Sequence, residues 1–336
     1  MSLADMNRRE FVGSLAVGGL AAGTLLPMAA QAAWKPAGHV EVVVGNTPGS
    51  GEDITARMMQ KVWQEASLVT TPTTIINKPG AGAALAWTYV NQHPNGGNYL
   101  TMASVLLLTN RINGLNQMRY TDLTALAILV GDEIVFTVYP GSTIKTGKDL
   151  IDRLKKDPAS VPIATSGVGG QNSVALGLVA KGAGIDPTKL KVVGFTGAAD
   201  AQTAVQGGHV EVLVSPASNT IGQIRAGALR AIGVASEGRL KGIMADLPPW
   251  REQGVDAVFT NWRGVFGPKN MPADAVAYWD GVLGKMVQQP GWLQQLDNAH
   301  LENFYHNAAQ SKVFLAKQYA QVLSIMKTLG YAKVDD

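Results

Sequence analysis

A glycine-rich turn between an apolar strand and a helix constrains the fold of this chain more than any other segment. Residues 39–44 form a short strand rich in valine, and Gly45-Asn46-Thr47-Pro48-Gly49-Ser50-Gly51 follows it directly. Apolar residues then recur at four-residue spacing from Ile54 to Ala66, which is typical of one face of a helix. Such a turn leaves the first N–H groups of the helix free to bind a carboxylate or phosphate. A tight strand–helix connection without a ligand would show the same pattern.

Strand and helix signals continue to alternate through the middle of the chain. The further predicted strands are 73–77, 99–103, 134–139, 161–165, 191–195, 210–214 and 229–235. This alternation predicts an α/β protein with largely parallel sheets, which bind ligands beyond the carboxyl ends of their strands. Residues 259–266 read as another strand, and from Pro272 onward the sequence predicts helices only, packed back on the first domain.

The length and composition predict two domains. The chain has 336 residues, of which 46% are hydrophobic, enough for two buried cores. We expect two lobes joined by two crossing strands, near 135–139 and 259–264. We therefore expect residues 34–135 and 262–336 to form the first lobe and residues 136–261 to form the second.

Residues 1–33 are predicted to be a twin-arginine-type signal peptide. Asn7-Arg8-Arg9-Glu10-Phe11-Val12 contains the arginine pair, and a glycine-interrupted apolar run leads to Ala30-Gln31-Ala32, an A-x-A cleavage site. A membrane anchor is the alternative, but the run is rich in glycine and ends in a cleavage site. The sequence therefore predicts a soluble protein exported to the periplasm.

The residue inventory gives little support to catalysis, metal binding or nucleic-acid binding. The chain has no cysteine, and its five histidines are scattered without an HExxH motif or a facing pair. No complete P-loop, dinucleotide fingerprint or G-x-S-x-G motif is present. The net charge is +3 with no run of Lys or Arg, so nucleic acid is not an expected partner. No metal or cofactor is expected.

Glycine-rich turns facing a helix start recur along the chain. They are Gly49–Gly51, Gly80–Gly82, Gly167–Gly170 and Gly197. One turn from each lobe, opposed across a cleft, would hold a small anion by backbone N–H groups and Ser or Thr hydroxyls. Because dipoles rather than cationic side chains bind the anion, its release remains easy.

A series of short segments along the chain forms a recognisable set of motifs. They are Trp34-Lys35-Pro36, Gly49-Ser50-Gly51-Glu52-Asp53 with Ala56-Arg57, Asn77-Lys78-Pro79-Gly80-Ala81-Gly82, Asn95-Gly96-Gly97-Asn98-Tyr99-Leu100, Asp122-Leu123-Thr124, Ser166-Gly167-Val168-Gly169, Gln206-Gly207-Gly208-His209-Val210-Glu211, Ile224-Arg225-Ala226-Gly227-Ala228-Leu229-Arg230-Ala231 and Trp262-Arg263-Gly264. In these segments the chain resembles the Bug-type (TctC-like) periplasmic receptors of tripartite tricarboxylate transporters. The segments occur in the family's order and cover essentially the whole chain after residue 33.

The resemblance implies a two-lobe type II periplasmic binding protein (Venus-flytrap) that closes around a carboxylate. It also implies docking of a monomeric receptor on the integral membrane subunits of a transporter. The ligand-binding residues expected on this basis are Asn46, Thr47, Gly49, Ser50, Gly51, Asp53 and Ser104 in the first lobe, and Ser166, Gly169, Gln171, Asn172, Phe195, Thr196, Gly197, Ala198 and Ser215 in the second.

Departures from the family pattern bear on the ligand. Asn46 replaces a usual aromatic residue, and Glu52 adds a carboxylate that must turn away or meet a cationic or hydroxyl part of the ligand. Asn172-Ser173 replaces a frequent histidine, and Phe195-Thr196-Gly197 replaces Y-K-G. Ser215 stands where many members have Asp, which favours a plain di- or tricarboxylate, hydroxylated like citrate, over an amine.

Alternative roles remain open for several of these residues. Asp53 could serve only the dipole of its helix, and Ser166 and Thr196 could be helix caps. Trp262 is expected in the core or hinge, whereas Arg263 fits either the surface or the cleft. The rival functions are an exported α/β enzyme with Ser50 or Ser166 as nucleophile, and a receptor for a membrane sensor.

Overall fold

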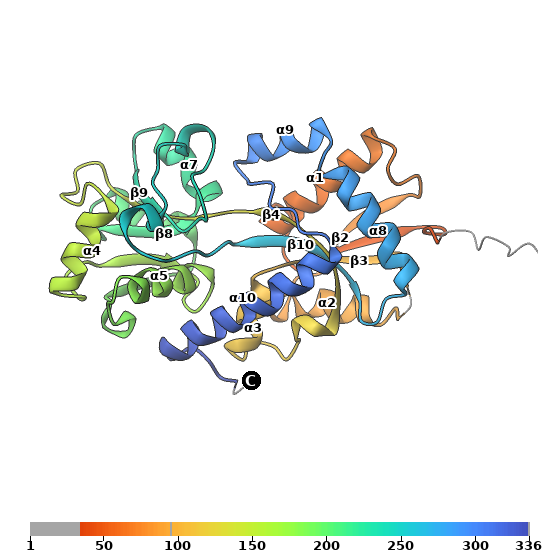
Figure 1. Ribbon diagram of the computed structural model, residues 1–336, viewed down its shortest axis with the longest axis horizontal. Helices are drawn as coiled ribbons and strands as arrows, with labels where there is room; N and C mark the ends of the chain where they lie inside the picture. Colours follow the sequence, from red (N-terminus) through yellow and green to blue (C-terminus); the bar gives the residue numbers. More distant parts are fainter. Residues whose placement is uncertain (1–33, 95, 335–336) are drawn as a thin grey trace, which may run out of the picture. The chain divides into compact units, whose positions relative to one another are not determined.

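The predicted strands, together with one at 123–131 that the sequence did not predict, assemble into two five-stranded sheets (Figure 1). Both sheets are mixed rather than largely parallel, since each has two parallel and two antiparallel pairings. The computed structural model describes residues 34–94 and 96–334, so the predicted signal peptide lies outside it. In sheet order the first sheet contains β2 (Thr73–Asn77), β1 (Val40–Val44), β3 (Tyr99–Ser104), β10 (Trp262–Pro268) and β4 (Leu123–Gly131). The second contains β7 (Val192–Phe195), β6 (Ile163–Ser166), β8 (Val212–Pro216), β5 (Ile134–Val138) and β9 (Arg230–Val234).

Helices cover both sheets and complete a two-lobe α/β fold, as predicted. The first lobe carries α1 (Gly51–Glu65), α2 (Ala84–Asn91), α3 (Leu106–Ile112), α8 (Ala273–Met286), α9 (Pro290–Ala299) and α10 (Ala308–Thr328). The second carries α4 (Gly147–Lys156), α5 (Gln171–Gly182), α6 (Ala198–Gln206) and α7 (Ala217–Arg225). Short 3-10 helices lie at Ala81–Ala83, Tyr120–Asp122, Pro187–Lys189, Gly242–Met244 and Trp250–Gln253. No helix of the described residues is long and apolar enough to cross a membrane.

The chain crosses between the sheets twice, and the two crossings are paired. The first runs from β4 through Asp132 and Glu133 into β5, so that the second sheet begins at Ile134. The second runs through Phe259 to Asn261 into β10. The N–H of Asp132 donates to the carbonyl of Asn261 at 3.0 Å, which fixes the crossings side by side.

The strand directions in the first sheet bring the start of β10 next to the carboxyl ends of its neighbouring strands. β1 pairs in parallel with β2 and β3, whereas β10 runs antiparallel to both β3 and β4. The start of β10 therefore lies beside the carboxyl ends of β3 and β4, with Arg263 paired in register with Ser104. The residues at which the chain leaves the first sheet and returns to it therefore lie together at one end of its strands.

The apolar face of α1 explains its orientation, with one departure from the sequence pattern. Met58 and Val62 are buried as the four-residue spacing predicts. Ile54 is 44% exposed and borders a cavity. The four-residue spacing therefore identified the helix correctly, and its first member lies in a cavity wall rather than in the core.

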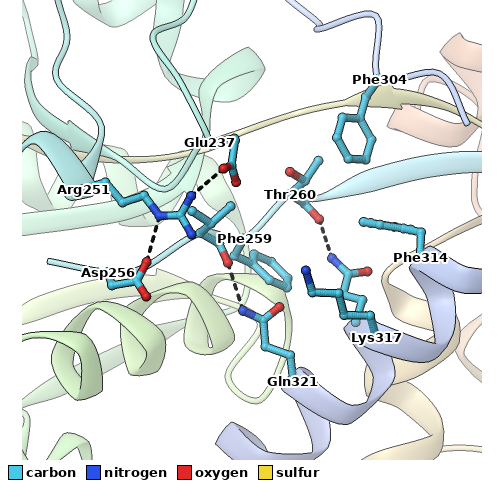
Figure 2. A pocket seen from close by; sticks show the side chains of 11 residues that line it. Glu237, Arg251, Asp256, Phe259, Thr260, Phe304, Phe314, Lys317 and Gln321 are labelled. Carbon is cyan, nitrogen blue, oxygen red and sulfur yellow. Dashed lines mark hydrogen bonds and ion pairs between the residues drawn. The ribbon is translucent and has the colours of Figure 1, made fainter.

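The last helix packs against both lobes rather than on the first alone. α10 contacts β4 and α3 of the first lobe and α5 of the second. Gln318 and Gln321 of this helix donate to the carbonyls of Thr260 and Val258 on the second crossing, each at 3.0 Å (Figure 2). The helix thus holds the crossing segment along its length.

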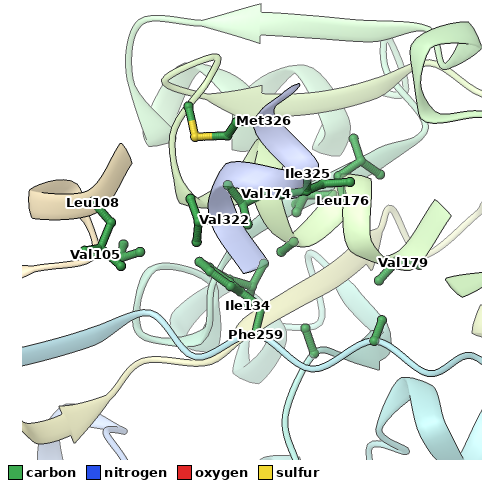
Figure 3. Close-up of a cluster of buried hydrophobic side chains, with 14 of the residues drawn as sticks. Val105, Leu108, Ile134, Val174, Leu176, Val179, Phe259, Val322, Ile325 and Met326 are labelled. Atoms are coloured by element: carbon green, nitrogen blue, oxygen red, sulfur yellow. The ribbon is translucent and has the colours of Figure 1, made fainter. Parts of the chain in front are cut away.

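One face of α10 belongs to a continuous apolar cluster (Figure 3). Val322, Ile325 and Met326 of α10 share this cluster with Val174 and Val179 of α5, and the cluster extends to Leu108 of α3. The close approach of α5 to α10 depends on a glycine, since a Cβ at Gly177 would lie 2.8 Å from Cγ1 of Ile325. This contact joins the two lobes on the side of the crossings.

Candidate functional site

The glycine-rich turn after β1 is held in place by Asp53. Its carboxylate accepts hydrogen bonds from the N–H of Gly49 at 2.9 Å and from Asn77 Nδ2 at 3.0 Å. Arg57 makes two further bonds to it, at 2.9 and 3.0 Å. Burial alone would raise the pKa of Asp53, but these bonds outweigh burial and lower the pKa below its usual value. Asp53 is 1% exposed, and its carboxylate orients the turn.

The turn leads into the positive end of α1. Ser50 is the N-cap, and its Oγ accepts from the N–H of Asp53 at 3.4 Å. The first N–H groups of a helix have no acceptor within the helix, so those at Gly51 and Glu52 are available to a ligand. The sequence predicted this feature, and the cap gives it a fixed direction.

A cavity of about 570 Å³ opens at this helix end and is lined by both lobes. The second lobe contributes Gln171 from α5 and Ser218 and Asn219 from α7. The end of α9 and the two residues after it, 298–301 in all, form part of the wall from the first lobe. This interlobe cleft is large enough for a small organic acid.

The cleft gathers some of the predicted site residues and not others. Those that line it are Asn46, Gly49, Ser50, Gly51, Ser104 and Gln171. Those that do not are Thr47, Asp53, Ser166, Gly169, Asn172, Phe195, Thr196, Gly197, Ala198 and Ser215. From the second lobe, the start of α5 at Gln171 and the start of α7 with Pro216 line this cavity, whereas the turns at 166–170 and 195–198 do not.

Two of those second-lobe loops present helix starts without side-chain caps. α5 begins after Gly170 and α6 after Gly197, and neither N-cap residue makes a side-chain bond. Ser166 and Thr196 are therefore not the N-caps, which removes that alternative for them. Ser166 instead accepts from Asn172 Nδ2 at its Oγ, at 3.2 Å, and at its carbonyl, at 3.1 Å.

Several buried polar atoms of the second lobe have no hydrogen-bond partner. Among them are Oγ1 of Thr165 in β6, Oδ1 of Asn172 in α5 and Oγ of Ser215 in β8. Asn172 is completely buried and Ser215 is 1% exposed. An unpaired buried polar atom costs free energy, so a hydrogen-bonding group that reached any of these atoms would be stabilised.

Charged side chains converge in the cleft, although their orientation could not be predicted from the sequence. Glu52 and Arg263 both line it. Asp132 lies between Arg263 and α7, accepting from Arg263 Nη2 at 2.5 Å and from the hydroxyl of Ser218 at 2.6 Å. The backbone N–H of Ser218 also donates to it, at 3.1 Å. Arg263 thus faces the cleft and is not a surface residue.

Asp132, Ser218 and Asn261 are site residues that the sequence did not reveal. Asp132 is 1% exposed and belongs to the first crossing, which the sequence placed a few residues later. The available signal was an acidic pair, Asp132-Glu133, between two buried apolar runs. A buried acidic pair between strands indicates a functional or structural charge site.

A second cavity of about 420 Å³ lies on the other side of the second crossing, against α10 (Figure 2). Phe259, Phe304 and Phe314 line it. Arg251 at its margin is paired with Glu237 at 2.5 Å and Asp256 at 2.8 Å. Lys317 also lines this cavity, and no α-helix begins among its lining residues.

Metal binding is not supported by the side chains that the structure places. Among residues 34–94 and 96–334 no group of three His, Asp or Glu side chains could hold a metal ion. The geometry therefore offers dipoles, hydroxyls and one buried Arg rather than a metal centre. Two lobes around a polar cleft define the class of solute-binding proteins.

The comparison with protein families identifies the family. The model of the tripartite tricarboxylate transporter family receptor, TctC, matches residues 64–331, and the chain belongs to this family. A relative from Cupriavidus necator, named "UPF0065 protein in gbd 5'region", is 25% identical over 98% of this chain and 99% of its own length. The resemblance seen in the motifs is therefore confirmed, and the family is one of solute-binding receptors rather than enzymes.

Solved structures share the fold. A TctC solute-binding protein from Polaromonas, without ligand, has a TM-score of 0.77 at 24% identity, over 88% of this chain and 99% of its own. An R. palustris protein with adipate, Rpa4515, has a TM-score of 0.73 at 20% identity, over the same shares. MatC from Rhodopseudomonas palustris, with bound malate, has a TM-score of 0.65 at 21% identity, also over 88% and 99%.

Proposed function

We propose that this protein captures a small carboxylate between its two lobes and delivers it to the membrane subunits of a tripartite tricarboxylate transporter. The expected ligand is a di- or tricarboxylate of the citrate kind. The observation that carries the proposal is the cleft itself, where the free N–H groups of α1 and the guanidinium of Arg263 meet. Both favour a carboxylate oxygen.

The mechanism is lobe closure without a chemical step. A ligand that touches the first turn of α1 and the start of α5 favours the closed arrangement in proportion to its contacts with both lobes. The uncapped starts of α5 and α6 would supply further N–H groups on closure, and Asn172 and Ser215 would supply unpaired acceptors or donors.

Location and assembly follow from the same proposal. Family members are periplasmic binding proteins, and we propose that residues 1–33 direct export by the twin-arginine route. We also propose that the receptor acts as a monomer. The competing role is that of a ligand-sensing receptor for a membrane sensor. Measured uptake in a strain that lacks only this protein distinguishes the two roles. Uptake of the ligand falls if the protein serves a transporter.

A thermal-shift screen of the mature protein tests carboxylate binding. At a hundred times its Kd, a ligand should stabilise the protein by about 2.7 kcal/mol. Gly51→Val should abolish the shift, because a Cβ there would lie 2.7 Å from the guanidinium of Arg263 and displace it. Gly222→Ala in α7 is the control, since its Cβ would meet no atom within 4 Å. A panel of mono-, di- and tricarboxylates without any shift contradicts the proposal.

A further inference from the structure

Glu52 is a buried carboxylate in the wall of the interlobe cleft. It is 5% exposed and occupies the first turn of α1, beside the N–H groups that would hold a ligand carboxylate. A negative side chain at this place is stabilised by the helix dipole but competes with an anionic ligand. The carboxylate of Glu52 strengthens the binding of a carboxylate ligand only if that ligand also carries a hydrogen-bond donor.

The neighbours of Glu52 favour its ionised form. Asn46 Nδ2 and the hydroxyl of Ser104 donate hydrogen bonds to its carboxylate, and the charge of Arg263 attracts it. Burial raises the pKa of Glu52, and the hydrogen bond of Ser104 and the charge of Arg263 offset only part of that rise. Asn46 Nδ2 and Arg263 can only donate and so favour the ionised form, whereas the hydroxyl of Ser104 can donate or accept.

Glu52 has acceptor capacity left for a ligand. An ionised carboxylate accepts about four hydrogen bonds, of which Asn46 and Ser104 use two. Arg263 does not neutralise Glu52 alone, because its Nη2 is bonded to Asp132 at 2.5 Å. Arg263 is the one Lys or Arg among the described residues of the cleft wall, against two carboxylates. A ligand oxygen without a proton would be repelled at Glu52.

Arg263 and Glu52 are close enough to act on one small ligand. A Cβ at Gly51 would lie 2.7 Å from Nε and Cζ of Arg263, so the guanidinium lies directly against the first turn of α1. Glu52 is the next residue of that turn. A ligand that binds both Arg263 and Glu52 must therefore carry its hydrogen-bond donor close to its own carboxylate.

We propose that Glu52 selects carboxylates that carry a hydroxyl or amino group near the carboxylate. Glu52 accepts the hydrogen bond of that group, while Arg263 and the first N–H groups of α1 hold the carboxylate. The inference rests on the proposed function and narrows its ligand to di- or tricarboxylates that carry a hydroxyl or amino group beside a carboxylate.

Calorimetric titration with matched ligand pairs tests the inference on the mature protein. The pairs are malate with succinate, citrate with propane-1,2,3-tricarboxylate, and aspartate with succinate; the members of each pair differ by one donor group. At least one pair should bind with a tenfold to hundredfold preference, about the range for a hydrogen bond to a charged group, for the member with the donor. Glu52→Gln should bring that ratio close to one, and Glu65→Gln, an exposed change at the other end of α1, should leave it unchanged.

The outcomes separate the inference from the proposed function. Binding of carboxylates with no preference in any pair overturns the role of Glu52 and leaves carboxylate binding intact. A preference that persists in Glu52→Gln assigns the selection to another residue and also overturns it. Absence of binding by every acid overturns both.

Discussion

Replacing Glu133 with Gln should change how stability depends on pH. Glu133 lies in the first crossing, is 5% exposed, and has one carboxylate oxygen, Oε2, without a partner. The pKa of Glu133 is raised to about 8, and burial is the largest cause. The hydrogen bond of Thr260 lowers the pKa, whereas the charges of Asp132 and Glu302 raise it. The native state therefore keeps the proton up to about pH 8, whereas the unfolded chain loses it near 4.5.

The size of the effect follows from these two pKa values. Between pH 4.5 and about 8 the native state binds more protons than the unfolded chain, so the free energy of unfolding falls as the pH rises. The slope is about 1.4 kcal/mol per pH unit, and the full interval is worth on the order of 5 kcal/mol. Gln is neutral throughout and removes this part of the pH dependence.

Urea unfolding at pH 5, 6.5 and 8 measures the difference. The stability of Glu133→Gln relative to the native protein should increase by several kcal/mol from pH 5 to pH 8, and level off above pH 8. Glu65→Gln, whose side chain is 56% exposed, should run parallel to the native protein. A constant difference between Glu133→Gln and the native protein would refute the reasoning, because Glu133 would then ionise normally in the fold.

Three further substitutions test the backbone of the first lobe and the glycine-rich turn. Gly264→Ala should lower the free energy of unfolding by about 2–3 kcal/mol, since its Cβ would lie 2.5 Å from the carbonyl oxygen of Ala127 and force β10 from β4. Gly281→Ala in α8, with no atom within 4 Å of the new Cβ, should raise it by about 0.5–1 kcal/mol; equal effects in urea titrations would contradict this contrast. Asp53→Ala should weaken ligand binding at least tenfold by calorimetry, because the N–H of Gly49 loses its acceptor. Undiminished affinity would show that the turn keeps its shape without Asp53.

Most of the fold was accessible from the sequence because β-branched runs and glycine turns alternate. The strand over 134–138 was predicted almost to its ends, and the helical character of the chain after Pro272 was predicted as well. β4, Leu123–Gly131, was missed. Its continuous Leu and Ala run lacks the alternation of a half-exposed strand, and β4 instead pairs with β10 while helices α8 and α10 cover it.

The site was predictable only where it is local in sequence. The turn from Asn46 to Gly51 carries its own signal, and the structure places most of it in the cleft. The meeting of Asp132, Ser218 and Arg263 depends on two crossings and an antiparallel strand, which no spacing along the chain encodes. The domain boundaries and the remaining second-lobe residues of the site stay predictions.

A crystal structure of the mature protein with the tightest carboxylate of the panel tests the central claim most directly. The account predicts the ligand in the interlobe cleft, with a carboxylate against the N–H groups of Gly51 and Glu52 and the guanidinium of Arg263, and with contacts to both lobes. A ligand bound instead in the aromatic cavity beside Phe304 and Phe314, with the cleft free of it, would contradict the account.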